Sequence, residues 1–511
     1  RSSRTLGSPA VYQLRPKKQK FGTLTRITVG EKNPKNPNKT ILLVGETGAG
    51  KSTLINALVN YSMGVKFEDE VWFQIVEEEK KRQTESQTSD VIVYEIFGFE
   101  DETLPYSLTI IDTPGYGDTR GTEYDKLVTQ RLLDLFQSED GVHELHAVGL
   151  VMKASNNRLS DRQSYIIGSV MELFGNNMGE KIVAFVTHSD GLTPENALTA
   201  LKTAKIKCAR NEKDEPVHFL FNNQQTKERT QENDAALEAA WRTTENGMTD
   251  LRTFLHKTAP QELTVTADVL KERIQLAACI DNLKDRIEFI ELKQTEVKQK
   301  QEGLQKNKEA MQKNETFTVE VDEPYKEKEN IRSGGYWLGL FHEGAVSCTV
   351  CEETCHYSCT MALTPRLCEV MKGGRCTSCS KKCPASNHVK GEWRYVTKVR
   401  KVLWTNEEMK KMYEKNKSEG QNKSSILENL KEEMNQLTAE KYRFLNESYQ
   451  HVEKLEQIAL KADSISTASY LDFLLEKMNE EGDTEKVQKL EEMRSRVDEG
   501  TKSGVQYSKR K

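Results

Sequence analysis

The segment Gly45–Ser52, which reads GETGAGKS, limits the possible folds of this chain more than any other feature. It matches the pattern G-x-x-x-x-G-K-[ST] in full, with the apolar run Ile41–Val44 before it and a helical pattern from Ser52 to Val59 after it. Glycines let such a loop curl so that backbone N–H groups face an anion, and the helix N-terminus adds a partial positive charge. A chance glycine-rich turn would not have the strand and the helix in order on either side. The sequence therefore predicts a phosphate-binding loop.

The residues of this loop have distinct expected roles. Lys51 is expected to bridge the β- and γ-phosphates of a nucleotide, which makes it a candidate catalytic residue. The Ser52 hydroxyl is expected to ligand Mg²⁺. The candidate nucleotide-binding residues here are Gly45, Glu46, Thr47, Gly48, Ala49, Gly50, Lys51, Ser52 and Thr53.

A second motif follows the apolar strand Leu108–Ile111, which ends in Asp112 and continues as Thr-Pro-Gly. Asp112 can hold Mg²⁺, usually through water, opposite Ser52. The backbone N–H of Gly115 can turn toward a γ-phosphate and swing away once that group has left. An ordinary turn is the alternative interpretation, and the phosphate-binding loop makes it the weaker one.

A threonine that closes over the magnesium ion should lie between these two motifs. Thr88 is our candidate for this metal ligand and for a second catalytic residue, with Thr84 as its rival. A loop threonine with no metal role is an equally good interpretation for either one.

Two further strands are expected to carry residues that read the base. Ile182–Val186 leads into a Thr-His-Ser-Asp segment, and Val217–Phe221 leads into two asparagines. The Asp190 carboxylate can accept hydrogen bonds from N1 and N2 of guanine, and adenine offers neither hydrogen. A plain surface loop is the alternative, but the order relative to the phosphate loop favours guanine over adenine. The candidate base-binding residues are Thr187, His188, Asp190, Asn222 and Asn223.

Tyr116 occupies the position directly after Gly115. In many GTPases a glutamine there orients the attacking water, and tyrosine lacks the amide that does so. Intrinsic hydrolysis is therefore expected to be slow, or to be completed by another group, for example from a second nucleotide-binding domain.

The chain of 511 residues is too long for one core, so several domains are expected. Apolar runs alternate with helical patterns from Thr40 to about Ala259, which predicts an α/β domain with a mostly parallel sheet and helices on both faces. The expected segments are a weakly structured lead-in with one strand over 1–38, the α/β domain over 39–260, a coiled-coil helix over 261–315, a Cys-rich insert over 316–404, a returning helix over 405–463 and a charged, loosely held helical or flexible tail over 464–511.

Two heptad seams predict long helices beyond the α/β domain. Apolar residues recur every seven positions from Val269 to Met311, and a second seam runs from Leu427 to Ile458. Two seams around a compact insert predict an antiparallel coiled-coil hairpin with the insert at its far end. Helices that pair with other chains are the alternative.

The insert is rich in residues that bind soft metals. Two C-x-x-C pairs about 25 residues apart are typical of thiolate clamps on tetrahedral Zn²⁺. Eight cysteines and two histidines can fill two structural sites, whose pairing the sequence leaves open; a disulfide cluster is the alternative. The candidate zinc ligands are Cys348, Cys351, Cys355, His356, Cys359, Cys368, Cys376, Cys379, Cys383 and His388.

The region from about 40 to 258 resembles the G domain of the GTPases of immunity-associated proteins, the GIMAP family, a group related to septins. The resemblance rests on Gly45–Asn56, Asp112–Thr119, the stretch from Arg158 to Gly175, Thr187–Asp190 and Phe221–Asn223. It implies a septin-related P-loop GTPase that binds GDP and GTP with Mg²⁺, hydrolyses GTP little, and forms nucleotide-controlled G-domain dimers or oligomers.

These features suggest three alternative functions. The first is a guanine-nucleotide switch with slow, dimer- or partner-assisted GTP hydrolysis that controls G-domain association and presents the coiled-coil and zinc arm to protein partners. The second is a non-hydrolysing GDP- or GTP-bound scaffold that acts through the coiled coil and the zinc module. The third, a chromosome-type ATPase with a zinc hook, needs a second ATPase lobe that the tail does not offer.

Charge and hydropathy limit the partners. The net charge is −5, and positive and negative residues are interspersed, which does not indicate a surface that binds nucleic acids in general. The sequence contains no run of 18 apolar residues, so a transmembrane segment is not expected. No apolar core of a signal peptide is visible. A reducing, cytoplasmic location is the resulting expectation.

Overall fold

The structure is a computed structural model of the chain. It describes residues 9–21, 24–76, 91–99, 103–114, 122–156, 161–204, 206–306, 318–331, 344–359, 362, 364–405, 407, 426–461, 465–497 and 502. The chain divides into two compact units. The first is Arg1–Lys271 with Leu455–Asp472 and Glu491–Lys511, and the second is Glu272–Lys454 with Phe473–Leu490.

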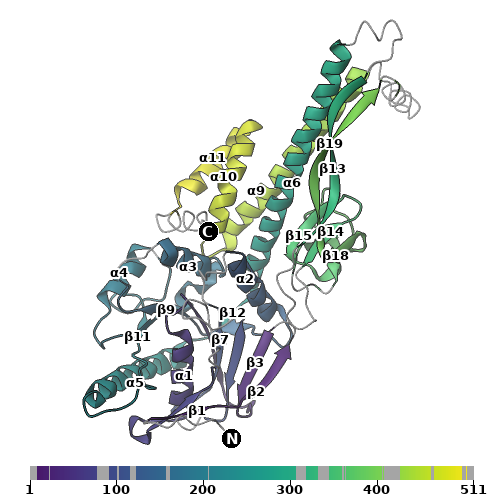
Figure 1. Cartoon of the computed structure of the whole chain (residues 1–511). Helices are drawn as coiled ribbons and strands as arrows, with labels where there is room; N and C mark the ends of the chain where they lie inside the picture. The colour runs from purple at the N-terminus through teal and green to yellow at the C-terminus, as the bar shows by residue number, and fades with distance from the viewer. Residues whose placement is uncertain are drawn as a thin grey trace. The chain divides into compact units, whose positions relative to one another are not determined.

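An eight-stranded sheet forms the centre of the first unit, as Figure 1 shows. Its order is β11-β10-β9-β4-β7-β6-β3-β2, and all neighbouring strands are parallel except the pairs β7–β6 and β3–β2. The predicted mostly parallel sheet is therefore confirmed. In chain order, its strands are β2 (Lys17–Phe21), β3 (Leu24–Val29), β4 (Asn38–Gly45), β6 (Ile92–Ile96), β7 (Ser107–Asp112), β9 (Ala147–Lys153), β10 (Ile182–Thr187) and β11 (His218–Leu220).

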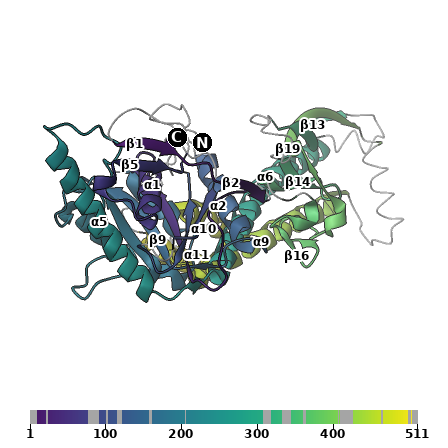
Figure 2. The same ribbon diagram turned by 90° about the horizontal axis from the view of Figure 1, so that it is seen from below.

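Helices cover both faces of this sheet, as predicted. On one face Leu43 belongs to the same buried cluster as Leu54 of α1 and Leu251 of α5. On the other face Leu150 of β9 and Ile166 of α3 line one small cavity. Figure 2 shows α1 and α5 from below. The helices are α1 (Lys51–Ser62), α2 (Thr122–Gln137), which the sequence analysis did not predict, α3 (Asp161–Met171), α4 (Glu195–Thr203) and α5 (Asp234–Lys257).

The stretch before residue 38 differs from the expected weakly structured lead-in with one strand. It carries β1 (Ala10–Gln13), β2 and β3, and β1 lies parallel to β5 (Val71–Gln74), as Figure 2 shows. The apolar side chains of Leu24 and Ile27 in β3 are buried in the core. β3 therefore joins this edge of the sheet, and β2 pairs with it. Smaller elements complete the unit: β8 (Glu144–Leu145) paired with β12 (Gln261–Glu262), and 3₁₀ helices at Phe67–Asp69 and Asn176–Lys181.

Two long helices lie beyond the sheet, α6 (Thr264–Lys306) and α9 (Ile426–Ile458). The predicted seam positions of α6 from Val269 to Val297 are buried. Contacts within the second unit run antiparallel: the Cys279 thiol lies 3.5 Å from the Ser448 hydroxyl, and Gln294 Nε2 lies 3.5 Å from Thr438 Oγ1. These contacts fit the expected direction of the returning helix, and a coiled-coil hairpin stays a prediction.

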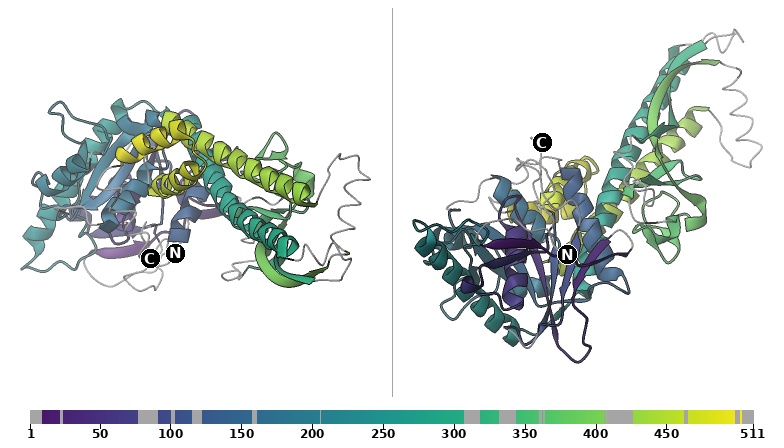
Figure 3. Two further views of the ribbon diagram at one scale, coloured as in Figure 1. Left: turned by 90° about the horizontal axis from the view of Figure 1, so that it is seen from above. Right: turned by 60° about the horizontal axis from the view of Figure 1, so that its bottom comes forward.

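The sequence predicts that the insert lies at the far end of the helical hairpin. In the structure the insert instead extends back along α6. β13 (Thr318–Asn330) and β19 (Trp393–Thr405) form an antiparallel ribbon that runs back along α6, as Figure 3 shows. Gln299 of α6 binds the backbone N–H of Asp322 at 2.8 Å near one end of the ribbon. Further along, the Lys326 ammonium lies 4.9 Å from the Phe289 ring centroid. Thirteen extended residues span about 40 Å, so each strand can return the chain along most of the helix.

A small Cys-rich module lies between the two ribbon strands in the sequence and packs against residues 275–286 of α6. Three side chains of α6 hold its backbone: Gln275 donates to the Glu369 carbonyl at 2.8 Å, Asn282 to the Thr354 carbonyl at 2.9 Å, and Arg286 to the Ser378 carbonyl at 2.7 Å. Its elements are β14 (Gly344–Cys348), β15 (Glu353–Cys359), β16 (Met371–Lys372), β17 (Arg375–Cys376), β18 (His388–Gly391) and 3₁₀ helices at Pro365–Leu367 and Ala385–Asn387.

The charged C-terminal stretch is more ordered than expected. It forms α10 (Ile465–Glu480) and α11 (Thr484–Ser495), and within the second unit it buries Leu474, Met478 and Leu490. Leu474 and Met478 lie four positions apart, on one face of α10, so the helix can bury both. Among the described residues, no helix is both long and apolar enough to cross a lipid bilayer.

The buried Glu272 carboxylate joins α6 to α9 through the half-exposed Lys454, and this pair gives a test of their contact. Burial alone would raise the pKa of Glu272, but hydrogen bonds from His451 and Lys454 outweigh it and lower the pKa to about 2. A depressed carboxyl pKa adds stability that is fully present above the ordinary value of 4.5 and is lost as the pH falls toward 2. We expect Glu272→Gln to destabilise the helix pair by about 2 kcal/mol at pH 7 and by progressively less below pH 4.5.

Hydrogen exchange of the α9 amides, measured between pH 7 and pH 3, checks this expectation. Glu302→Gln, an exposed change on the same helix, is the matched control and should leave the exchange rates unchanged. An equal effect of Glu272→Gln at both ends of the pH range would contradict the assignment.

Candidate functional site

The loop after β4 has a backbone shape that requires glycine. Gly48 and Gly50 have φ angles of 78° and 94°, in the left-handed region. Gly50 precedes α1, and no side chain caps the first turn of that helix. Its first backbone N–H groups can therefore bind an anion. The Thr47 hydroxyl oxygen is also buried with no hydrogen-bond partner among the described residues, so the loop fits an added polar ligand.

Lys51 lies folded over this loop. Its side chain is buried, and its ammonium donates to the carbonyls of Gly45 at 2.8 Å and Glu46 at 3.3 Å. Burial lowers the pKa of Lys51, and the carboxylates of Asp112 and Glu46 partly oppose this effect. An ammonium that donates its hydrogen bonds to neutral carbonyls would bind phosphate oxygens more strongly, because both partners would then be charged.

The neighbouring strand builds the side of the site that is predicted to bind metal. β7 pairs with β4 so that Asp112 lies opposite Leu43, and the Thr113 hydroxyl donates to the Leu43 carbonyl at 2.9 Å. Asp112 is fully buried, and Ser52 is half-buried in the first turn of α1. These oxygen donors suit Mg²⁺, and both come from elements that meet at the carboxyl end of the sheet. Thr88, its rival Thr84, Gly115 and Tyr116 lie outside the described residues.

The segments predicted to bind the base lie at the same edge of the sheet. β10 and β11 are parallel, and the Ser189 N–H donates to the Phe221 carbonyl at 3.1 Å just beyond them. Asp190 is exposed, and its carboxylate accepts the Leu192 N–H at 3.0 Å. The Asn223 amide nitrogen is buried with no hydrogen-bond partner among the described residues. Asn222 is fixed through its N–H, which donates to Thr244 at 3.0 Å.

Thr187 has a positioning role that the sequence analysis did not find. Its hydroxyl lies 2.7 Å from the Ala49 carbonyl and 3.2 Å from the Met152 carbonyl, so it joins the phosphate loop to the end of β10. His188 is exposed, with a φ of 55°, and its Nδ1 lies 3.1 Å from that hydroxyl. Partial burial of the ring lowers the pKa of His188, and Lys153 adds to the effect, which favours the neutral imidazole.

Comparison with known proteins agrees with this geometry: residues 39–240 match the sequence model of the AIG1 family. This segment is an AIG1-family G domain. Human Septin-5 is 29% identical over 128 residues, a match that covers 24% of this chain and 32% of Septin-5. The chain thus spans about a third of the length of that relative.

Solved structures of Toc33 from Arabidopsis thaliana are also similar. The complex with GDP and Mg²⁺ has a TM-score of 0.29 and 17% identity, covering 43% of this chain and 86% of Toc33. The complex with Mg²⁺ and GMPPNP has a TM-score of 0.29 and 14% identity, covering 44% and 88%.

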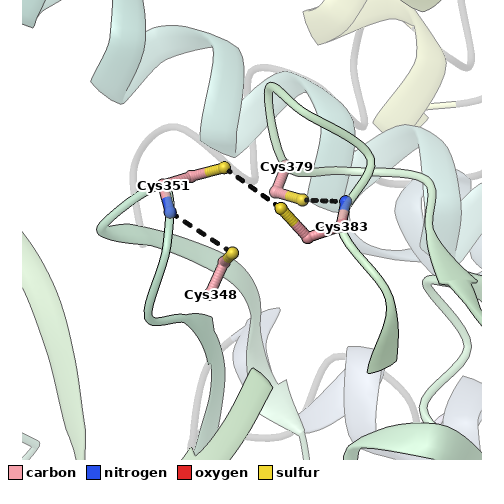
Figure 4. A group of neighbouring side chains, drawn as sticks. All are labelled: Cys348, Cys351, Cys379 and Cys383. Atoms are coloured by element: carbon pink, nitrogen blue, oxygen red, sulfur yellow. Dashed lines mark hydrogen bonds between the residues drawn. The ribbon is translucent and has the colours of Figure 1, made fainter. Parts of the chain in front are cut away.

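Outside the G domain, the Cys-rich module gathers its donor atoms into three groups. Each group has four ligand atoms within 4.8 Å of one another. The groups are Cys348, Cys351, Cys379 and Cys383; Cys355, Cys376, Cys379 and His388; and His356, Cys359, Cys368 and Glu369. All ten predicted candidates are therefore brought together, and Figure 4 shows the first group.

Glu369 is the one donor that the sequence analysis missed. A carboxylate next to Cys368 was the available signal, because Asp and Glu also bind zinc. Burial alone would lower the pKa of His356, but Cys359 and Glu369 outweigh it and raise the pKa to about 10. The side chains of Cys359 and Glu369 in this third group therefore favour a positive charge beside them.

The described cysteines form no disulfide. The thiols of Cys351 and Cys383 are 3.7 Å apart, far beyond a covalent S–S bond of about 2.05 Å. Cys208 and Cys279 are buried and belong to none of the three groups.

Proposed function

We propose that the G domain binds GDP and GTP with Mg²⁺. The observation that carries this proposal is the phosphate loop with Lys51 buried over it and Asp112 beside it. The backbone N–H groups of the loop and Lys51 would hold the phosphates, and Ser52 and Asp112 would hold Mg²⁺, with Thr88 and Gly115 as further candidates. Bound Mg²⁺ would neutralise the charge of the β- and γ-phosphates.

Guanine is the base that this site suits best. The Asp190 carboxylate can accept two hydrogen bonds from the N1 and N2 hydrogens of guanine. It would exchange its present bond to the Leu192 N–H, a local turn contact, for a charged interaction with the base. The buried Asn223 amide supplies a further donor at this edge. Adenine has an acceptor at N1, so Asp190 would repel it.

We propose that hydrolysis is slow and needs a dimer or a partner. Tyr116 lacks a side-chain amide that could orient the attacking water. A second copy of the G domain is the proposed source of the missing group, so the nucleotide state would control G-domain association. The alternative, a scaffold that keeps its nucleotide, would show no turnover even at protein concentrations that saturate a dimer.

The helical arm and its Cys-rich module are proposed to act as the output of the G domain. Structural zinc would fold the module, and protein partners would bind the arm. A reducing, cytoplasmic location is part of this proposal because thiolates that bind zinc must stay reduced.

The test is a base-specificity change at Asp190. In calorimetry, the wild type should bind GDP and GTP and ignore ATP at the same concentration. Asp190→Asn should weaken GDP binding about 100-fold, since a charged acceptor is lost. The same variant should bind xanthosine diphosphate more tightly than the wild type does, because the asparagine amide can donate to the 2-carbonyl of xanthine.

Asp214→Asn is the matched control, because that carboxylate is exposed and outside the predicted site. ATP preference in the wild type, or unchanged GDP binding in Asp190→Asn, would overturn the guanine assignment. Single-turnover GTP hydrolysis at rising protein concentration then separates the switch, which speeds up with concentration, from the scaffold, which stays inactive.

A further inference from the structure

The Cys-rich module has too few aliphatic side chains to form a core of the usual kind. Its buried cluster contains Ala278, Val346, Ala362, Val370 and Met371, and the remaining members are seven cysteines. Buried thiols in such density need either disulfides or a metal, and the described cysteines form no disulfide. The arrangement of the donors then decides how many ions the module holds.

Cys379 belongs to two of the three donor groups. It lies within 4.8 Å of Cys348, Cys351 and Cys383 on one side and of Cys355, Cys376 and His388 on the other. The three groups hold eleven different residues, because eight cysteines, two histidines and Glu369 supply the donors. Three tetrahedral ions need twelve ligand positions. Eleven residues fill twelve positions only if one residue serves two ions, and Cys379 is the one that the geometry shares.

We propose that the module binds three zinc ions, two of them joined by the bridging thiolate of Cys379 and the third held separately by His356, Cys359, Cys368 and Glu369. This inference rests on the proposal that the insert binds zinc. It replaces the two sites expected from the eight cysteines and two histidines, and it adds Glu369 as a ligand.

The donor separations match tetrahedra around zinc. Zn–S bonds of about 2.3 Å give S···S edges of about 3.8 Å, and Zn–N or Zn–O bonds of about 2.0 Å give shorter edges. In the first group the Cys351 and Cys383 sulfurs are 3.7 Å apart, and in the third group Cys359 and Cys368 are 3.9 Å apart. His356 Nδ1 lies 3.3 Å from Glu369 Oε2, and the Cys368 sulfur lies 3.6 Å from the same oxygen.

His388 is oriented as a metal ligand of the second group. Its Nδ1 lies 2.9 Å from the Pro384 carbonyl, which fixes Nδ1 as the donor nitrogen. Its Nε2 is then the lone-pair nitrogen, and this atom is buried with no hydrogen-bond partner among the described residues. A histidine that binds metal through one ring nitrogen usually donates the other N–H to a carbonyl or carboxylate. His388 is only 5% exposed, so bulk solvent does not serve as the partner of Nε2.

Backbone N–H groups support the thiolates. The Cys379 sulfur accepts the Cys383 N–H at 3.1 Å, and the Cys376 sulfur accepts the N–H groups of Ser378 and Cys379 at 3.3 and 3.2 Å. Figure 4 shows the first of these contacts and the equivalent bond from the Cys351 N–H to the Cys348 sulfur. Hydrogen bonds to sulfur stabilise the charged form, which is the form that binds metal.

The β-structure explains why neighbouring residues serve different ions. Cys355 and His356 are adjacent in β15, and successive side chains of a strand point to opposite faces. Cys355 therefore reaches the second group and His356 the third. On the neighbouring strands, Cys348 of β14 and His388 of β18 are paired in register, which brings the first and second groups side by side.

The first experiment counts metal ions in the reduced full-length protein by native mass spectrometry and elemental analysis. Three zinc ions per chain are expected, and Cys208→Ser, which changes a buried thiol of the G domain, should keep all three. A count of two would overturn the three-ion inference and leave zinc binding intact. A count of zero would overturn zinc binding as well, and nucleotide binding in the same sample shows whether the G domain proposal survives independently.

The second experiment tests the bridge by challenging variants with a chromogenic chelator. Cys379→Ser should release two zinc ions, because both joined centres lose a ligand, whereas Cys348→Ser and His356→Ala should release one each. Release of a single ion from Cys379→Ser would contradict the bridge. In wild type loaded with Co²⁺, two of the three ions should be magnetically coupled and lose their paramagnetic resonance signal, and three independent signals would also refute it. This last measurement needs no variant to fold.

Discussion

Lys51→Met should weaken GDP and GTP binding by about 30-fold to several thousand-fold, since truncating one partner of a buried charged contact costs about 2–5 kcal/mol. The nucleotide-free variant should nevertheless unfold at the same temperature as the wild type, or higher. Burial lowers the pKa of Lys51, which means that the charged side chain opposes folding at pH 7. Among the described residues its ammonium donates hydrogen bonds to the carbonyls of Gly45 and Glu46, and methionine keeps the length of the side chain without the charge.

Thermal unfolding with and without nucleotide separates these two effects. GDP at about 100 times its wild-type dissociation constant should stabilise the wild-type G domain by about 2.7 kcal/mol. At the same GDP concentration the stabilisation of Lys51→Met should fall below about 1 kcal/mol. Lys202→Met, an exposed change on α4, controls for the loss of a surface charge. A nucleotide-induced shift that persists undiminished in Lys51→Met would mean that the phosphates bind elsewhere.

The phosphate loop and the strands around it could be read from the sequence because local signals agreed there. An apolar strand, a glycine loop and a helix occur in one continuous stretch, so the order of elements already fixes the place of Lys51 and Ser52. β10 and β11 were predicted for the same reason, and the residues that follow them lie at the expected edge. Thr187 is the exception: its contact with the Ala49 carbonyl joins segments 138 positions apart, and no pattern within either segment encodes it.

The donor groups of the Cys-rich module and the path of the insert could not be predicted, because they depend on contacts between distant segments. The three donor groups combine residues from β14, β15, β17, β18 and the turns between them, so spacing along the chain could not assign Cys379 to two groups. The return of the insert along α6 depends on a ribbon whose two strands are separated by the whole module. Its strands carry alternating charges such as Glu320 and Lys401, which pair across the ribbon at 2.6 Å but read as solvated segments in the sequence.

Removing metal should unfold the Cys-rich module and leave the G domain able to bind nucleotide. Structural zinc in small modules contributes about 10–16 kcal/mol of apparent binding free energy at pH 7, which five aliphatic side chains in a shared cluster cannot replace. In hydrogen exchange, the amides of β14, β15 and β18 should lose protection by at least about a thousandfold, the equivalent of roughly 4 kcal/mol. The chelated protein must be kept reduced, because free thiols 3.7 Å apart would otherwise form disulfides that imitate the metal.

The same loss should reach α6, because Gln275, Asn282 and Arg286 bind backbone carbonyls of the module. Arg286 would lose its bond to Ser378 and its pairing with Glu353 at once, which leaves a buried guanidinium without those acceptors. Exchange should therefore rise in the middle of α6 as well as in the module, while the amides of β4 and α1 stay protected. Readdition of zinc to the reduced protein should restore both regions together. If the module stays protected after every metal ion has been removed, its fold does not depend on metal, and the proposal of structural zinc is wrong.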